Sequence, residues 1–404
     1  MATIQTIQVG LDKDTCEVLW KDGHTGRFHA KWLRFNCRCE QCVSPIPGVY
    51  TINIPLFPDD LSLISASVDC EGKKLQTEYK GEILPEHKTV HPANWLRSKC
   101  YCDACLDSKI AKRDVISRYV TSNDGERNVR KMQYKTLLDD EDIGLYRLLK
   151  DVVEAGVCLI QNVPTEERKV VEIAKKIAYI EPTSYGKMYD IYVRDSENVA
   201  YTNLMLPLHQ DQVSSEIAPG IQLLHTMRFD KSVTGGESII VDMFEAVEVL
   251  RVESPEDFRT LVEVPGCWLT EDPSAGRYFE HHKCHIQLDY FGKVAAVNWN
   301  ATTFSTPQVR DKDVNRYYKA YTTLSNITRR KSMQYCFKLE PGDLIVFNNR
   351  RMAHARKGYE LNGGTRHLQG TYIKLDDMKS KYLALCRKLE KNVVPPKIGN
   401  NCSF

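Results

Sequence analysis

One short pattern occurs twice in the first part of the chain, and it restricts the fold more than any other feature. The segment from His24 reads HTGRFHAKWLRFNCRCEQC, and the segment from His87 reads HKTVHPANWLRSKCYCDAC. Both match H-x7-W-L-R-x-x-C-x-C-x-x-C without a gap, an agreement far beyond chance. We therefore predict that this region contains two copies of one small structural unit.

Each copy places three cysteines within six residues: Cys37, Cys39 and Cys42 in the first, and Cys100, Cys102 and Cys105 in the second. Three sulfurs at this spacing cannot easily pair among themselves. A structural zinc site takes four tetrahedral ligands of the cysteine and histidine type. Each cluster therefore predicts three thiolate ligands, with a histidine expected as the fourth ligand, although the spacing does not identify which one. The alternative is a compact turn with reduced, unligated cysteines.

Composition narrows the class of protein. The 404 residues are 42% hydrophobic, which is enough for two domains or more. A net charge of +2 gives no electrostatic case for nucleic acid, and no apolar run is long enough to span a bilayer. The first residues include acids before the first arginine, Arg27, and lack the apolar stretch of a secretory signal. These features predict a cytoplasmic protein whose 14 cysteines stay mostly reduced.

Hydrophobic patterning divides the chain into four predicted segments. Residues 1–105 have the pattern of short strands and turns, including TCEVLW, RFHAKWL and LSLISASVDC, and would form a small zinc-binding, β-rich domain. Residues 106–134 form a polar and basic connector, part of it helical. Residues 135–392 combine many short strands with flanking helices, which is typical of a double-stranded β-helix, or jelly roll. Residues 393–404 form a tail, and the predicted class is mainly β with flanking helices (α+β).

Periodicity also predicts individual elements of the larger domain. A helix with apolar residues at positions 148, 149, 152 and 153 should end at Gly156, before the buried strand VCLIQNV. Further helices are expected over 166–179, 244–251, 313–324 and 376–388. The expected strands are GIQLLHTMR, ESIIVD, KCHIQLDY, KVAAVNWN, QYCFKL, DLIVFNN and HLQGTYIKL.

A metal-binding pattern lies among these strands. LPLHQDQ contains His209 and Asp211, and residues i and i+2 of a strand point to the same face. His354 follows the strand of FNNRRMAH, and Arg366 lies on the expected next strand. Two histidines and one carboxylate form the facial triad of non-haem Fe(II) oxygenases. Arg366 is the expected partner of a dicarboxylate co-substrate, because a guanidinium matches a carboxylate bidentately. The alternative for His354 alone is a hydrogen-bonded core histidine.

These motifs resemble those of the gamma-butyrobetaine dioxygenase and trimethyllysine dioxygenase family, the 2-oxoglutarate-dependent hydroxylases of carnitine biosynthesis. The resemblance extends over nearly the whole chain. It rests on WLRFNCRCEQC with His87, and on NVAYT, HQD, PGIQLLH, TGGES, VDMF, PGDLIVFNN, AHAR, YE and RHLQGTY. Close gamma-butyrobetaine hydroxylases usually have HTD in place of HQD. The middle residue is not a ligand, so the iron site is unaffected.

The resemblance implies a set of site residues. It implies iron at His209, Asp211 and His354, 2-oxoglutarate at Arg366 with Ser238 close to it, and zinc at Cys37, Cys39, Cys42 and His87. It implies an aromatic cage of Tyr185, Tyr189, Tyr201 and Tyr372, with Asn198 and either Asn298 or Asn300 at the substrate's carboxylate. A trimethylammonium group cannot donate hydrogen bonds, so aromatic faces are suited to bind it. Without the resemblance, these tyrosines would be interpreted as ordinary strand packing.

The implied activity is hydroxylation of gamma-butyrobetaine to L-carnitine with Fe(II), O2 and 2-oxoglutarate, with ascorbate as reductant and structural Zn(II). Trimethyllysine 3-hydroxylation is the first alternative, and a zinc-stabilised pseudoenzyme or binding scaffold is the second. The expected partners are a small trimethylammonium substrate and a second copy of the chain in a homodimer, with no nucleic acid and no membrane.

The repeat adds a hypothesis to the family pattern. The implied zinc site takes its cysteines from the first copy and its histidine from the second. If a pseudo-twofold axis relates the copies, a reciprocal site follows. We hypothesise a second structural zinc at Cys100, Cys102, Cys105 and His24.

Overall fold

The computed structural model describes residues 2–46, 49–113, 129–193 and 199–391. The chain divides into two compact units, Met1–Ala111 and Lys112–Phe404. The boundaries expected at 105 and 134 remain predictions, and the expected tail, 393–404, lies outside the described residues. Within the described residues, no helix has the length and apolar character needed to cross a bilayer.

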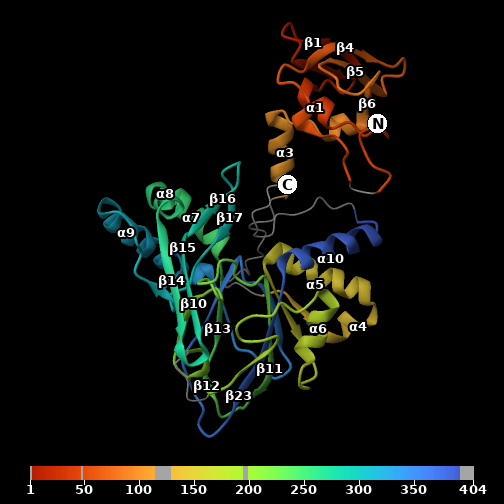
Figure 1. The fold of residues 1–404 in the computed structure, drawn as a ribbon. Helices are drawn as coiled ribbons and strands as arrows, with labels where there is room; N and C mark the ends of the chain where they lie inside the picture. Colours follow the sequence, from red (N-terminus) through yellow and green to blue (C-terminus); the bar gives the residue numbers. More distant parts are fainter. Residues whose placement is uncertain (1, 47–48, 114–128, 194–198, 392–404) are drawn as a thin grey trace. The chain divides into compact units, whose positions relative to one another are not determined.

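The first unit contains the same series of elements twice (Figure 1). Three antiparallel strands, β1 (Ile4–Val9), β2 (Thr15–Trp20) and β3 (Thr25–His29), lead into helix α1 (Ala30–Phe35). Three more, β4 (Ser62–Val68), β5 (Lys74–Lys80) and β6 (Thr89–Pro92), lead into α2 (Ala93–Ser98). The 3-10 helix η1 (Ile54–Leu56) precedes β4, and α3 (Asp103–Arg113) follows α2. Both copies contribute to a shared core that includes Trp20, Phe28, Leu63 and Leu75.

One expected strand in this unit is wrong. RFHAKWL is a strand only as far as His29, and helix α1 begins at Ala30. Ala30 and Leu33 are buried three residues apart, which is the spacing of one helix face. The sequence left this segment ambiguous, because a short apolar run does not distinguish helix from strand. Burial of one helix face in the tertiary structure favours the helix.

The second unit is a jelly roll built on two main sheets, as predicted. The six-stranded sheet has the order β7-β8-β20-β11-β23-β9, and the four-stranded sheet has the order β10-β21-β13-β19. The first comprises β7 (Lys131–Gln133), β8 (Val157–Gln161), β20 (Leu344–Asn348), β11 (Ile221–Phe229), β23 (Arg366–Ile373) and β9 (Tyr189–Ile191). The second comprises β10 (Leu206–His209), β21 (Met352–Arg356), β13 (Ser238–Asp242) and β19 (Gln334–Phe337).

Helices cover the outer faces of the sheets. The six-stranded sheet is flanked by α4 (Tyr134–Asp139), α5 (Glu141–Ala155), α6 (Lys169–Ile177) and α10 (Leu375–Lys388) (Figure 1). Three other helices lie near the four-stranded sheet: α7 (Met243–Glu253), α8 (Pro255–Glu263) and α9 (Asp311–Thr328) (Figure 1). Gly156 ends α5 as expected, in the left-handed conformation with φ 77°. Sequence patterning missed α8 and the hairpin of β14 (Pro265–Asp272) and β15 (Arg277–Cys284).

The remaining short strands complete the unit. β18 (Phe304–Ser305) pairs with β14, β12 (Thr234–Gly235) pairs with β22 (Tyr359–Glu360), and β16 (Ile286–Leu288) pairs with β17 (Val294–Val297). The 3-10 helices are η2 (Val199–Tyr201), η3 (Pro273–Ala275) and η4 (Lys331–Met333).

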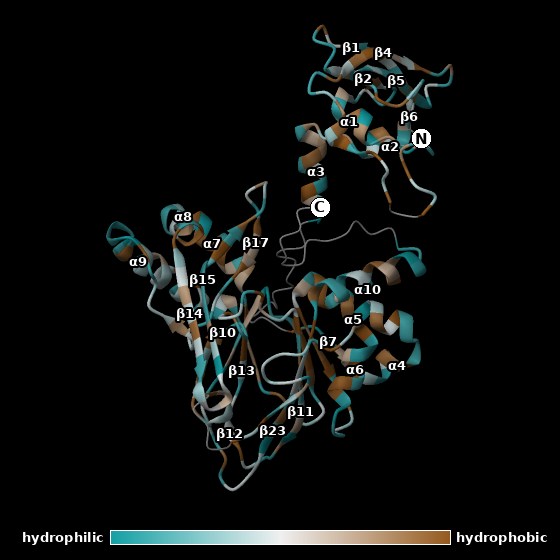
Figure 2. Cartoon of the chain, in the orientation of Figure 1, coloured by the Kyte–Doolittle hydropathy of each residue, from teal (hydrophilic) through white to brown (hydrophobic). Residues whose placement is uncertain are grey.

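The alternation of side chains along the strands decides what faces the interior between the two sheets. In β11, Ile221 and Leu223 pack in the cluster under the helices, whereas Leu224 packs in the cluster between the sheets. Hydrophobic residues accordingly concentrate along the strands of both sheets (Figure 2). Because successive side chains point to opposite faces, Gln222 shares the interior face with Leu224. The same reasoning places His354 opposite to Ala353, which packs in the helix-covered cluster of the four-stranded sheet.

Candidate active site

The three proposed metal ligands meet where β10 and β21 are paired. His209 is the last residue of β10 and stands opposite His354 in the antiparallel ladder. The centroids of the two imidazole rings are 4.1 Å apart. Asp211 Oδ1 lies 3.1 Å from His209 Nε2 and 3.9 Å from His354 Nε2. All three ligand atoms lie within 4.8 Å of one another, so one ion can contact them all.

Hydrogen bonds orient these ligands. His209 Nδ1 donates to the carbonyl of Pro207 at 2.8 Å, which leaves the lone pair of Nε2 free to coordinate. Asp211 Oδ2 accepts from Tyr372 Oη at 2.5 Å and from Gln222 Nε2 at 2.7 Å, so Oδ1 is the oxygen that faces the histidines. The donor set of two imidazoles and one carboxylate therefore fits Fe(II) in a facial triad.

The pKa values of the triad agree with this donor set. Burial and, to a smaller extent, the neighbouring His209 lower the pKa of His354 to about 3, so the imidazole is neutral. Burial acts to raise the pKa of Asp211, but its close contact with His209, together with His354 and the hydrogen bond from Tyr372, holds that pKa well below its usual range. Asp211 is therefore a carboxylate, as a metal ligand must be.

Two residues that sequence reasoning missed hold the loop after β10. Asn349 accepts from the Asp211 backbone N–H at 2.7 Å and donates to the Asp211 carbonyl at 3.1 Å. Gln210, the middle residue of HQD, donates to the Asn349 carbonyl and accepts from the Trp299 backbone N–H. Both side chains are buried. For Asn349, the signal in the sequence was the polar pair Asn348 and Asn349 at the end of an apolar strand, and for Gln210 it was the position between His209 and Asp211.

Arg366, at the start of β23, is a buried cation whose Nε has no hydrogen-bond partner among the described residues. It lies over the rings of Phe229 and Tyr359, with its Cζ 5.5 and 5.3 Å from their centroids. Burial and, to a smaller extent, the positive charge of Arg356 lower its pKa to about 10. Two neighbouring buried guanidinium groups favour an anionic ligand. Ser238 stands opposite Arg356 in the pairing of β13 with β21.

Four tyrosines gather next to the triad. The Tyr189 and Tyr372 rings are stacked with centroids 5.4 Å apart, and Tyr185 follows at 6.2 Å from Tyr189. Burial raises the pKa of Tyr185, and the nearby Asp211 and Tyr201 act in the same direction. Tyr201 is buried at the end of η2. The aromatic faces and the Asp211 carboxylate therefore belong to one site.

The asparagines are placed differently. Asn198 lies outside the described residues. Asn298 donates its amide to the Cys284 carbonyl. Asn300 donates to the Gln210 carbonyl, and its Oδ1 accepts from Thr302 and Thr303. These bonds make Asn300 a support of the HQD loop, and contact of Asn298 or Asn300 with substrate stays a prediction.

The fold also places the three cysteines of the first cluster next to His87. His87 Nε2 lies 3.6 Å from Cys37 Sγ and 3.3 Å from the sulfurs of Cys39 and Cys42. His87 Nδ1 meets Glu82 at 3.0 Å, which fixes the ring. Three thiols and one imidazole with all four ligand atoms within 4.8 Å match the donor set of a tetrahedral zinc site.

Comparison with known proteins gives concordant findings. Residues 117–372 match the family model described as taurine catabolism dioxygenase TauD, TfdA family, and residues 7–80 match that of gamma-butyrobetaine hydroxylase-like, N-terminal. The gamma-butyrobetaine dioxygenase of Pseudomonas sp. (strain AK-1) is 30% identical, over 92% of this chain and 93% of that protein. The trimethyllysine dioxygenase of Meyerozyma guilliermondii is 28% identical, over 93% and 94%.

Two further similarities were found. The gamma-butyrobetaine dioxygenase of Homo sapiens is 28% identical, over 96% of this chain and 98% of that protein. Among solved structures, a taurine dioxygenase from Burkholderia xenovorans is similar with a TM-score of 0.43 at 14% identity, covering 57% of this chain and 80% of that one.

Proposed function

Since this chain belongs to the taurine catabolism dioxygenase TauD, TfdA family, we propose that it hydroxylates gamma-butyrobetaine to L-carnitine, the last step of carnitine biosynthesis. It is an Fe(II)- and 2-oxoglutarate-dependent dioxygenase that acts on a small molecule. The observation that supports the substrate class, a trimethylammonium compound, is the group of four tyrosines beside the triad. Aromatic faces attract a quaternary ammonium group, which offers no hydrogen bond to a polar site.

Each part of the site has a proposed task. His209, Asp211 and His354 would hold Fe(II), which when bound supplies the activation of O2 coupled to decarboxylation of 2-oxoglutarate. Arg366, with Ser238 near, would bind the far carboxylate of 2-oxoglutarate. The tyrosines would fix the cation so that one C–H bond of the substrate faces the metal, and positioning of this kind is the protein's main contribution.

Further parts of the proposal concern the whole protein. Zinc at Cys37, Cys39, Cys42 and His87 would stabilise the first unit, because structural zinc contributes directly to folding free energy. Ascorbate as reductant, a homodimer and a cytoplasmic location belong to the same proposal.

Trimethyllysine 3-hydroxylation is the second candidate. The relative from Meyerozyma guilliermondii, named trimethyllysine dioxygenase, is 28% identical over 93% of this chain. Both substrates carry a trimethylammonium group, so the tyrosine group fits either of them. Because the buried Arg366 and the triad are both present, a pseudoenzyme is the weaker alternative.

A competition assay tests the choice between the two substrates. The reconstituted protein is supplied with Fe(II), 2-oxoglutarate and equal concentrations of gamma-butyrobetaine and trimethyllysine, and both hydroxylated products are measured by mass spectrometry. We expect carnitine to dominate. Dominant hydroxytrimethyllysine would assign the second candidate, and the absence of both products with intact metal binding would favour the pseudoenzyme.

The tyrosine group gives a second expected result. The Tyr201→Leu variant should bind gamma-butyrobetaine about 5–30-fold more weakly, since one desolvated cation–π contact contributes roughly 1–2 kcal/mol. Turnover of 2-oxoglutarate without substrate should stay close to that of the parent. Binding is measured by calorimetry with Fe(II) and a non-reactive 2-oxoglutarate analogue. Tyr179→Leu is the matched control, because Tyr179 is exposed. Equal affinity for an uncharged isostere with carbon in place of nitrogen would contradict a cation–π cage.

A further inference from the structure

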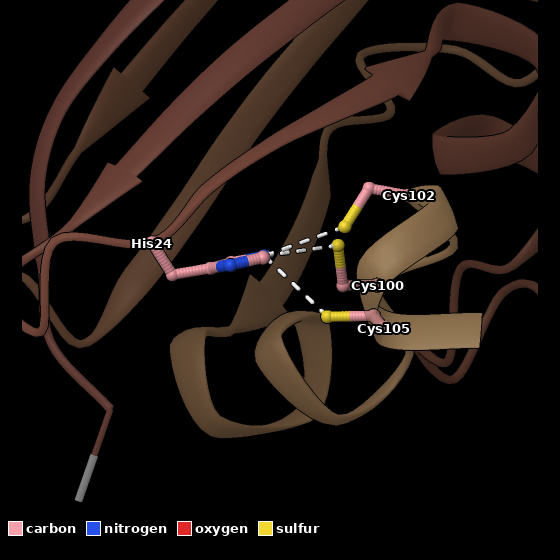
Figure 3. Close-up of side chains that lie close together, drawn as sticks. All are labelled: His24, Cys100, Cys102 and Cys105. Carbon is pink, nitrogen blue, oxygen red and sulfur yellow. Dashed lines mark hydrogen bonds between the residues drawn. The ribbon is translucent and has the colours of Figure 1, made fainter. Parts of the chain in front are cut away.

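The second cysteine cluster forms a complete ligand set in the first unit. Figure 3 shows Cys100, Cys102 and Cys105 converging on the imidazole of His24. His24 Nε2 lies 3.3 Å from Cys100 Sγ, 3.6 Å from Cys105 Sγ and 3.9 Å from Cys102 Sγ. All four ligand atoms lie within 4.8 Å of one another. We propose that these residues bind a second structural zinc ion.

The ligands cross between the two copies of the repeat in both directions. His24 follows β2 of the first copy, whereas its three cysteines follow α2 of the second. In the first cluster, the cysteines follow α1 and His87 precedes β6. Two such ions would therefore connect the copies twice, once in each direction.

The pairing of equivalent residues supports a pseudo-twofold axis. Trp32 and Trp95 occupy the same place in the two copies of the pattern. Their rings contact each other with centroids 5.5 Å apart. A residue meets its own equivalent only close to a twofold axis, so an operation that generates one metal site generates the other as well.

The surroundings of the ligands are duplicated too. In the first site Arg34 Nη1 donates to Cys42 Sγ at 3.4 Å, and Arg34 also pairs with Glu82. In the second site Arg97, the equivalent residue, donates to Cys105 Sγ at 3.4 Å and pairs with Asp22. Three thiolates around Zn(II) leave one net negative charge, which the arginine balances. Such outer partners tune a metal site and add to its affinity.

Asp22 also connects the arginine to the fourth ligand. Its carboxylate accepts from the backbone N–H of His24 at 3.0 Å and from Arg97 Nε at 3.2 Å. Gly26 lies so close that an added Cβ would stand 2.9 Å from Cys100 Sγ. The strand therefore approaches the sulfur at a distance that only glycine permits.

The donor set selects the metal. Three thiolates and one imidazole suit zinc in tetrahedral coordination, whereas Mg²⁺ and Ca²⁺ prefer oxygen ligands. The second site is more exposed than the first, since only Cys100 is buried, whereas Cys37, Cys42 and His87 are all buried in the first. We therefore expect the second ion to be released first by a chelator.

Metal analysis tests the proposal on the whole chain. Zinc per chain is measured under reducing conditions in a His354→Ala background, so that zinc cannot complete a site at the triad. We expect two zinc ions per chain, falling to one in Cys102→Ser and in His24→Ala. Cys39→Ser should also retain one, and the double variant Cys39→Ser/Cys102→Ser none. Cys70→Ser is the matched control and should retain two, because Cys70 is exposed and outside both clusters.

A measurement on the unsubstituted chain gives a result that does not depend on whether the variants fold. Native protein is treated with iodoacetamide before and after removal of zinc, and each cysteine is followed by mass spectrometry. Cys102 and Cys105 should react only after chelation, whereas Cys70 reacts in both conditions. Alkylation of Cys102 and Cys105 at the rate of Cys70 with zinc present would overturn the proposal. One zinc per chain that Cys102→Ser leaves unchanged would overturn it as well.

Discussion

Replacing Asp211 by alanine should abolish turnover while the protein stays folded. Asp211 is the one carboxylate of the proposed triad, and its Oδ1 lies 3.1 Å from His209 Nε2. Loss of an outer partner of a metal ligand costs about 10–100-fold in affinity or activity, so loss of the ligand itself should cost at least about 100-fold. The measurements are product formation and Fe(II) affinity by anaerobic calorimetry. His209→Ala and His354→Ala should behave in the same way.

Gln222→Leu is the graded control for this experiment. It removes the 2.7 Å hydrogen bond to Asp211 Oδ2 but leaves every proposed ligand in place. We expect Fe(II) affinity and turnover to fall by about 10–100-fold, less than in Asp211→Ala. Activity close to that of the parent in any of the three alanine variants would remove the residue from the triad.

Replacing Arg366 by alanine should raise the KM for 2-oxoglutarate by about 30–150-fold. The physical reason is the loss of a charge-assisted, bidentate contact in a buried site, which contributes roughly 2–3 kcal/mol. The KM for the cationic substrate should change far less, because that substrate is held by the tyrosines. Initial rates are measured with each substrate varied in turn.

Two further variants separate charge from shape at Arg366. Arg366→Lys keeps the positive charge but lacks the planar fork, so we expect a KM for 2-oxoglutarate between those of the parent and the alanine variant. Arg228→Ala is the control, because Arg228 is an exposed arginine of β11 paired with Asp230. Equal increases in KM for both substrates in Arg366→Ala would give Arg366 a general structural role.

Much of the architecture was predictable because it depends on local pattern. Gly156 was expected to end a helix and does so with a positive φ. The strands around GIQLLHTMR, DLIVFNN and HLQGTYIKL occur as β11, β20 and β23. Helix α8 and the β14–β15 hairpin were missed; α8 spans only nine residues, and the apolar residues of β14 form a short run, Cys267–Leu269, which does not distinguish strand from helix.

The sequence by itself determined which residue types are available and how they are spaced. The repeated motif placed two equivalent sets of cysteine and histidine residues, and the sequence placed His209 and Asp211 two residues apart. The expectation that both lie on one strand was wrong, because β10 ends at His209 and Asp211 lies in the turn that Asn349 holds. The contacts of Gln222 and Tyr372 with Asp211 could not be predicted from their separation along the chain. Only the register of β11 against β23 directs Gln222 and Tyr372 to the same carboxylate. The tertiary structure decided such contacts because pairing across sheets sets which side chains meet, and a shift of one residue would turn each of them to the opposite face.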